Sequence, residues 1–375
     1  MNRLFFWLMV TALLTVSCGS KPNPNEIRIG EFASLTGSQA TFGQSNHEGL
    51  LLAISEINAA GGIGGKQLVV TTVDDQGKPE EAAVAVTKLL TQDSSQVILG
   101  EVASSLSLAA APICQTNKIP MISPSSTNPK VTQVGDYIFR VCFIDPFQGQ
   151  VMADFAIDKL KAKTAAIFRD QKSDYSMGLA DYFITRFLSK GGKIVSDQSY
   201  VQGDIDFKAQ LTNLRATKPD VIFVPGYYTE VGLIARQARE LRLKQPLLGG
   251  DGWDSPKLFE IGGKALEGCY HSDHFTAQSK DPKVQAYVKK YQAAWGHVPD
   301  ALATLAYDAA GVLAQALKSA KTLSGQDIRD ALASVKNYQG VTGSISMNEN
   351  RDAVKPAVVL KISGGKEVYV STVNP

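Results

Sequence analysis

Between Glu26 and Gly268, short apolar runs of strand length alternate with longer segments whose apolar residues recur every three or four positions. The apolar runs predict strands at Glu26–Ala33, Leu68–Val73, Val97–Leu99, Ile119–Ile122, Tyr137–Val141, Ala165–Phe168, Lys193–Tyr200, Val221–Val224 and Leu247–Leu248. The periodic segments predict helices at His47–Ala60, Glu80–Thr91, Gln150–Leu160, Met177–Leu188, Phe207–Arg215 and Glu230–Leu241. Regular alternation of strand and helix is typical of parallel sheets covered by helices on both faces.

The C-terminal part of the chain changes this rhythm. It predicts helices at Lys283–Trp295, Ala301–Ala320 and Gly325–Val335, then strands at Gly343–Met347, Ala357–Ile362 and Val368–Val373. A helical stretch followed by a strand-rich one indicates that the chain visits each of two domains twice. We therefore expect two α/β lobes, with doubly wound parallel sheets, formed by residues 26–145 plus 275–346 and by residues 146–274 plus 347–375.

The N-terminus has the pattern of an export signal. Arg3 precedes the apolar run LFFWLMVTALLTV, which is too short for an ordinary membrane span. The ending Thr15-Val16-Ser17-Cys18 resembles a bacterial lipobox, so we expect residues 1–18 to be a lipoprotein signal, with Cys18 as the lipidation site. Residues 19–25 then form a tether. A plain secretory signal is the alternative.

Composition excludes several functions. The chain has 375 residues with 38 basic and 36 acidic side chains, and it lacks the basic stripe typical of nucleic-acid binding. We interpret Cys114, Cys142 and Cys269 as buried apolar residues. No GxSxG or HExxH motif is present, and the cluster His271, Asp273 and His274 has alternating side chains that do not converge on one metal. We expect no enzyme activity, metal or cofactor.

Val97–Pro129 has the most informative polar pattern. Two predicted strands each end in hydroxyl residues: Ser104 and Ser105 after the first, then Ser123, Ser125, Ser126 and Thr127 after the second. At neighbouring strand ends, hydroxyls and free helix N–H groups suit a carboxylate ligand. The alternative is that these side chains only cap helices.

Seven segments together resemble the type I periplasmic binding proteins of the branched-chain amino acid (leucine/isoleucine/valine-binding) class, which serve ABC transporters. They are INAAGGIGGKQL, ASSLS, MISPSSTNP, RVCFIDPFQG, DYSMGLA, PGYYTEVGLIARQAR and GGDGW. The resemblance covers nearly all of the chain after the export signal. It implies two α/β lobes joined by three crossovers that close on a ligand, with hinges near Asp145, His271–Phe275 and Met347–Lys355.

The resemblance also implies the ligand-binding residues. The amino acid's α-carboxylate is expected to bind Ser105 with its neighbour Ser104, and Ser125 and Thr127 with Ser126 between them. Phe42, placed on the loop before the first helix, is expected to cover the ligand side chain. The remaining candidates lie in the second lobe: Tyr175, Tyr227, Asp251 for the α-ammonium group, and Trp253 lining the pocket. We interpret Asp145 as a helix cap or an indirect supporting residue.

The sequence thus predicts an extracytoplasmic, lipid-anchored and monomeric receptor, in the periplasm or on the outer face of the cell membrane. It is expected to capture an amino acid, branched-chain or otherwise apolar, and to deliver it to ABC permease subunits. A ligand-sensing domain coupled to a membrane or regulatory partner is the alternative, and an amidase or other hydrolase is a third hypothesis. The pattern does not select one amino acid over another, and it leaves open whether any two of the three cysteines pair.

Overall fold

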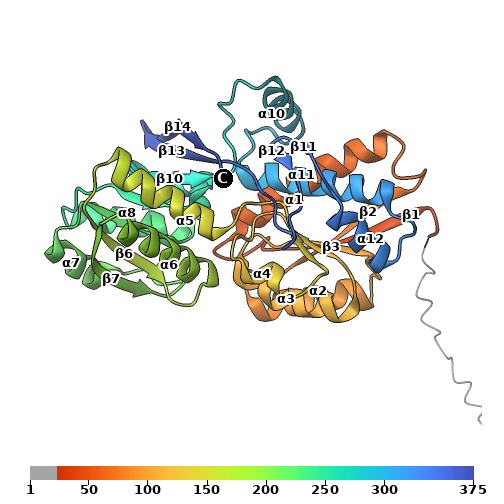
Figure 1. The fold of residues 1–375 in the computed structure, drawn as a ribbon, viewed down its shortest axis with the longest axis horizontal. Coiled ribbons are helices and arrows are strands. Elements are labelled where there is room, and N and C mark those ends of the chain that lie inside the picture. The colour runs from red at the N-terminus through yellow and green to blue at the C-terminus, as the bar shows by residue number, and fades with distance from the viewer. Residues whose placement is uncertain (1–22) are drawn as a thin grey trace, which may run out of the picture.

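The computed structural model describes residues 23–375 as two α/β lobes side by side (Figure 1). The predicted signal and Cys18 lie outside these residues. The chain passes between the lobes three times, after β5, after β10 and before β13, so the second lobe is built from two separate segments. Among the described helices, none is both long and apolar enough to cross a bilayer.

The first lobe surrounds a five-stranded parallel sheet of order β2-β1-β3-β4-β5. Its strands are β1 (Glu26–Ala33), β2 (Gln67–Asp74), β3 (Val97–Leu99), β4 (Met121–Ser123) and β5 (Ile138–Arg140), with a separate hairpin of β11 (Tyr338–Gly340) and β12 (Gly343–Ile345). Its helices are α1 (Ala40–Ala59), α2 (Pro79–Thr91), α3 (Ser104–Asn117), α4 (Lys130–Gln133), α10 (Pro282–Trp295), α11 (Ala301–Ser319) and α12 (Gly325–Ala333).

Both faces of this sheet are buried, as the apolar strand runs predict. In β3, Ile98 packs with the core under α2 and α3, whereas Val97 and Leu99 pack with the core under α1, α11 and α12. A Cβ at Gly49 would lie 1.9 Å from the Ala303 carbonyl oxygen, so glycine is required where α1 crosses α11.

The second lobe contains a seven-stranded sheet of order β14-β13-β10-β9-β8-β6-β7. Its strands are β6 (Thr164–Asp170), β7 (Lys193–Tyr200), β8 (Val221–Phe223), β9 (Leu247–Gly249), β10 (Tyr270–Asp273), β13 (Ala357–Ser363) and β14 (Lys366–Val373). Its helices are α5 (Asp145–Asp154) with a π-helical turn (Phe155–Lys159), α6 (Asp174–Ser189), α7 (Lys208–Thr217), α8 (Tyr228–Glu240) and α9 (Pro256–Gly262), with 3₁₀ turns at Asp251–Trp253 and Gly263–Leu266.

The sequence pattern predicts a wholly parallel second sheet, but the structure shows a mixed one. β13 runs antiparallel to β10 and forms a hairpin with β14. The turn is Gly364-Gly365, both with positive φ (61° and 75°), which is the geometry favoured in two-residue hairpins. The hairpin therefore adds an antiparallel edge to a parallel sheet.

Three expectations about individual residues change. Phe42 and Gly43 lie inside α1, which begins at Ala40 rather than at His47. Neither α3 nor α4 has a side-chain N-cap: Ser104 and Ser105 are the first two residues of α3, and the serines before α4 do not cap it. Asp145 is the first residue of α5 and also makes no cap. Cys114, Cys142 and Cys269 are buried, as predicted, and all three are free thiols, which answers the question of pairing that the sequence leaves open.

Candidate functional site

The carboxyl ends of the strands in both lobes meet at a small enclosed cavity of about 10 Å³. The first lobe contributes Phe42 from α1, Val102 and Ser125 from strand-end loops, and Leu302 from α11. The second lobe contributes Tyr175 from α6, Tyr227, and Asp251-Gly252 from the turn after β9. Five sequence-predicted residues therefore come together here: Phe42, Ser125, Tyr175, Tyr227 and Asp251.

Hydrogen bonds between the lobes hold the structure closed around this cavity. The Thr41 Oγ1 and Ser255 Oγ atoms lie 2.8 Å apart, and Thr229 Oγ1 donates to the Ser38 carbonyl at 2.8 Å. On another side of the cleft, the Asn128 amide donates to the Asp174 carbonyl at 2.7 Å. Closure of this kind shields a bound ligand from water.

One hydroxyl of the first lobe remains available for a ligand. Ser125 Oγ lines the cavity, is buried and lacks a hydrogen-bond partner among residues 23–375. A buried unpaired hydroxyl is costly, so this atom calls for a partner from outside the protein. Thr127 does not line the cavity, and its hydroxyl lies beside the Asp145 carboxylate, so Ser125 is the first-lobe donor best placed for a carboxylate ligand.

The other predicted serines have partners within the protein. Ser104 Oγ accepts from Asn128 N at 3.2 Å, and Ser126 Oγ donates to the carbonyls of the Glu101–Val102 loop at 2.9–3.0 Å. Ser105 Oγ donates to Asp174 Oδ2 and accepts from Asp174 N, both at 3.0 Å, across the cleft. These three serines brace the binding loops in the closed structure.

The second lobe supplies a held carboxylate. Asp251 Oδ1 accepts from the Tyr175 hydroxyl at 2.9 Å, and Asp251 Oδ2 lies 3.1 Å from His274 Nε2. The Asp251 backbone N–H donates to Gln148 Oε1 at 2.8 Å. Each carboxylate oxygen keeps a free lone pair, so Asp251 can still accept a hydrogen bond from a ligand cation.

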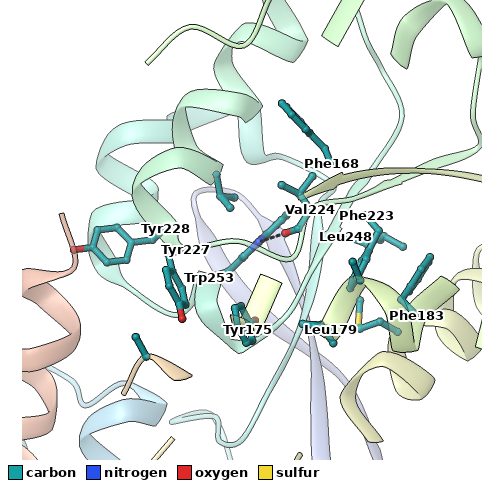
Figure 2. Close-up of a cluster of buried hydrophobic side chains, with 14 of the residues drawn as sticks. Phe168, Tyr175, Leu179, Phe183, Phe223, Val224, Tyr227, Tyr228, Leu248 and Trp253 are labelled. Carbon is teal, nitrogen blue, oxygen red and sulfur yellow. Dashed lines mark hydrogen bonds between the residues drawn. The ribbon is translucent and has the colours of Figure 1, made fainter. Parts of the chain in front are cut away.

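Aromatic rings line the cavity beside these polar groups, and Figure 2 shows two of them, Tyr175 and Tyr227. Tyr175 and Tyr227 stack at 5.2 Å with an angle of 6° between the rings. Phe42 meets Tyr227 and Tyr228 edge to face, at 5.5 and 4.9 Å. Burial raises the pKa of Tyr175 and of Tyr227, so both phenols stay neutral and can donate hydrogen bonds.

Trp253 does not line this cavity. Its indole is fully buried in the second lobe and Nε1 donates to the Val224 carbonyl at 3.0 Å, as Figure 2 shows. The ring packs on Gly249, where a Cβ would lie 2.1 Å from it, and near His271. The expectation that Trp253 lines the pocket is wrong, because its indole is buried against Gly249 in the second lobe instead of facing the cavity.

Two groups of buried acids flank the site. Burial is the main cause that raises the pKa of Asp145 to about 8; the Asp251 charge adds to it, and the Thr127 hydroxyl partly offsets it. Both Asp145 oxygens lack a well-aligned hydrogen-bond partner in the described chain. Ser34 Oγ lies 2.8 Å from Asp75 Oδ1 and 2.9 Å from Glu101 Oε1. One hydroxyl proton cannot serve two carboxylates, so this pair retains a proton.

Sequence reasoning missed several contributors. Val102 and Leu302 carry no local signal, because one follows a strand end and the other comes from a distant segment. His274 was considered only as a metal ligand with His271 and Asp273, although strand alternation turns His274 to the opposite face. In residues 23–375 no group of three or more His, Cys, Asp or Glu side chains could hold a metal ion.

A larger hollow of about 460 Å³ lies behind the hinge, next to Phe147 and Val354. It is mainly apolar, and the unpaired hydroxyl of Ser125 does not face it. Ser125, Asp251 and the two tyrosines converge at the smaller cavity between the strand ends, so that cavity is the better candidate ligand site.

The chain matches the periplasmic binding protein family over residues 26–366. It is 30% identical over 347 residues to the Leu/Ile/Val-binding protein homolog 3 of Brucella melitensis, covering 92% of this chain and 93% of the relative. It is 30% identical over 354 residues to the leucine-, isoleucine-, valine-, threonine- and alanine-binding protein of Pseudomonas aeruginosa, covering 94% and 92%.

Two crystal structures share the fold, each with a TM-score of 0.89 and 93% coverage of this chain. One is the leucine binding protein LivK of Thermotoga maritima, at 38% identity and 99% coverage of that protein. The other is the substrate binding protein LivJ of Streptococcus pneumoniae in complex with isoleucine, at 35% identity and 100% coverage. This chain belongs to the periplasmic binding protein family and is a solute-binding receptor of the type I fold.

Proposed function

We propose that this receptor captures an aliphatic α-amino acid between its lobes and delivers it to an ABC permease. One observation carries the proposal: the unpaired buried hydroxyl of Ser125 lines the cavity on one side and the Asp251 carboxylate lines it on the other. A zwitterion needs donors for its carboxylate and an acceptor for its ammonium group. The apolar residues Phe42, Val102 and Leu302 would contact its side chain.

The relatives support this ligand class. The Brucella and Pseudomonas proteins are named for binding leucine, isoleucine and valine, and the Streptococcus structure holds isoleucine. The cavity has room for about one water, so an amino acid must enter while the lobes are apart. Binding then favours closure, because the ligand contacts both lobes only in the closed state.

Binding rather than catalysis is the proposed role of the site's hydroxyls. None of the three candidate serines that brace the loops, Ser104, Ser105 and Ser126, has a histidine as its hydrogen-bond partner in the described chain. His274 instead contacts Asp251. A serine nucleophile needs an adjacent base, and this arrangement offers none.

The location follows from the N-terminal pattern. We propose that Cys18 is lipidated, that residues 19–25 tether a monomer to the outer face of the membrane, and that residues near 145, 274 and 346 are the hinges. Replacement of Cys18 by Ser should release the exported protein into the soluble fraction. Retention of Cys18→Ser on the membrane would contradict the anchor.

The function is tested by thermal unfolding and calorimetry of the purified protein with each of the twenty amino acids. A ligand at 100 times its dissociation constant should add about 2.7 kcal/mol to the free energy of unfolding. We expect the largest stabilisation from leucine, isoleucine or valine, and none from the matching amides or decarboxylated amines. If none of the twenty amino acids stabilises the protein, the proposal is overturned.

A further inference from the structure

His274 occupies an unusual place between the hinge and the candidate ligand site. It follows β10 directly, where the chain leaves the second lobe, and its side chain is fully buried. Nε2 lies 3.1 Å from Asp251 Oδ2, and Nδ1 has no hydrogen-bond partner within residues 23–375. Among the described residues, the Asp251 carboxylate is therefore the one hydrogen-bond partner of the imidazole.

The ring of His274 also contacts another crossover. It stacks on Phe143 with ring centroids 3.6 Å apart and 25° between the planes. Phe143 precedes α5, in the segment that joins the first lobe to the second. One side chain thus joins two of the three connections between the lobes to the carboxylate that faces the cavity.

We propose that His274 is a positioning residue for the ligand's ammonium group. Its neutral imidazole holds the Asp251 carboxylate by a hydrogen bond, and its ring packs on Phe143 at the hinge. The inference rests on the proposed function and adds a role to a residue outside the cavity wall. Tyr175 holds the other carboxylate oxygen in the same way, so both oxygens are fixed by neutral donors.

The neutrality of these donors matters. A carboxylate accepts only, so Nε2 must carry the proton and Nδ1 is bare, which agrees with the absence of a partner at Nδ1. Burial lowers the pKa of His274, while the hydrogen bond and charge of Asp251 act in the opposite direction and Lys355 lowers it further. A cationic donor would neutralise Asp251 and compete with the ligand; a neutral one leaves its charge available.

Two variants of His274 separate the effect of its hydrogen bond to Asp251 from the effect of its stacking ring. His274→Phe keeps a stacking ring and removes the donor, and His274→Gln keeps an amide N–H near the Nε2 position and removes the ring. We expect His274→Phe to weaken amino acid binding by about tenfold or more, and His274→Gln by less than about threefold. His297→Gln is the matched control, because His297 is exposed and lies near Glu48 outside the cavity.

A pH profile gives a readout that a purely structural role would not change. Burial lowers the pKa of His274 from 6.5, so wild-type affinity should fall as the pH drops below that value towards about 4 and His274 gains a proton that pairs with Asp251. The fall should be smaller in His274→Gln, which has no imidazole to protonate. The other groups facing this site are Lys355, Asp145 and Tyr175, and burial raises the pKa of the last two above this range.

The outcomes distinguish this inference from the proposed function. If the wild type binds no amino acid, the function itself fails. If it binds, and His274→Phe retains full affinity, the positioning role is overturned. Identical pH profiles for wild type and His274→Gln would overturn it as well, and this comparison remains decisive even if His274→Phe does not fold.

Discussion

The two sides of the cleft prepare for a ligand in different ways. In the second lobe, Asp251 is held at both carboxylate oxygens and at its backbone N–H before any ligand arrives. In the first lobe, the Ser125 hydroxyl that lines the cavity has no hydrogen-bond partner in the described part of the chain. A misplaced charge is expensive in a buried site, whereas a hydroxyl can rotate to meet an acceptor. The protein fixes the charged partner and leaves the neutral one adjustable.

The buried acids of the two lobes also differ in the charge that they carry. Asp251 is held by neutral donors, so its charge is free to meet a cation. In the first lobe, Asp75 and Glu101 share the Ser34 hydroxyl, and burial raises the pKa of Asp75 to about 6 and that of Glu101 well above its usual value. Retaining a proton there lowers the negative charge on the side of the cleft that would hold the ligand's carboxylate.

The strongest test of this contrast is Asp251→Asn. The amide keeps the shape of the carboxylate but removes the charge that faces the ammonium group. We expect affinity to fall by about 3 kcal/mol or more, about a hundredfold or more, by calorimetry. Asp206→Asn, an exposed site at the start of α7, should leave affinity unchanged. Equal affinity in Asp251→Asn would remove Asp251 from the site.

Much of this contrast was visible in the sequence. The strand-end hydroxyls were predictable because parallel strands bring their carboxyl ends to one edge, whereas Asp251 was predicted from the family resemblance. The location of Phe42 was not, because Gly43 reads as a helix breaker. In the structure a Cβ at Gly43 would lie 2.2 Å from the Ser34 carbonyl oxygen, so this glycine permits α1 to pack closely on the loop that follows β1. The roles of Leu302 and His274 depend on tertiary contacts that no local pattern records.

The second prediction concerns the proton held by Asp75 and Glu101. Because the pKa of Asp75 is raised in the folded state, the stability it contributes is fully present below about pH 4 and is lost as pH rises through about 6. Asp75→Asn should therefore raise the free energy of unfolding at pH 8 by ~1–3 kcal/mol relative to wild type, with little gain at pH 4.

Urea unfolding of the ligand-free protein at both pH values measures this effect. Glu349→Gln is the control, since Glu349 is exposed and should give the same difference from wild type at each pH. A destabilised Asp75→Asn variant at pH 8 would mean that the ionised pair, and not the protonated one, supports the first-lobe loops.

A smaller effect is expected from Ser125→Ala. Loss of one donor to the ligand carboxylate should weaken binding by ~1–2 kcal/mol, while the free protein keeps its stability because that hydroxyl has no partner among residues 23–375. Ser126→Ala should do the reverse and lower the free energy of unfolding, since Ser126 Oγ donates to the Glu101–Val102 loop. Calorimetry and urea unfolding of both variants test this assignment. A Ser126→Ala variant that loses affinity but keeps its stability would contradict it.

The smallest predicted effect is that of Ser105→Ala, which distinguishes a ligand-binding role for Ser105 from a role in closing the lobes. Family resemblance assigns it to the ligand carboxylate, whereas in the closed structure it exchanges two hydrogen bonds with Asp174 of the other lobe. A partly exposed contact of this kind contributes less than ~1 kcal/mol to closure, so Ser105→Ala should weaken every amino acid ligand by the same factor, about fivefold at most. A donor to the ligand carboxylate would instead cost about tenfold or more. Calorimetry of Ser105→Ala with leucine, isoleucine and valine therefore separates a latch between the lobes from a binding group, because a latch costs about fivefold at most.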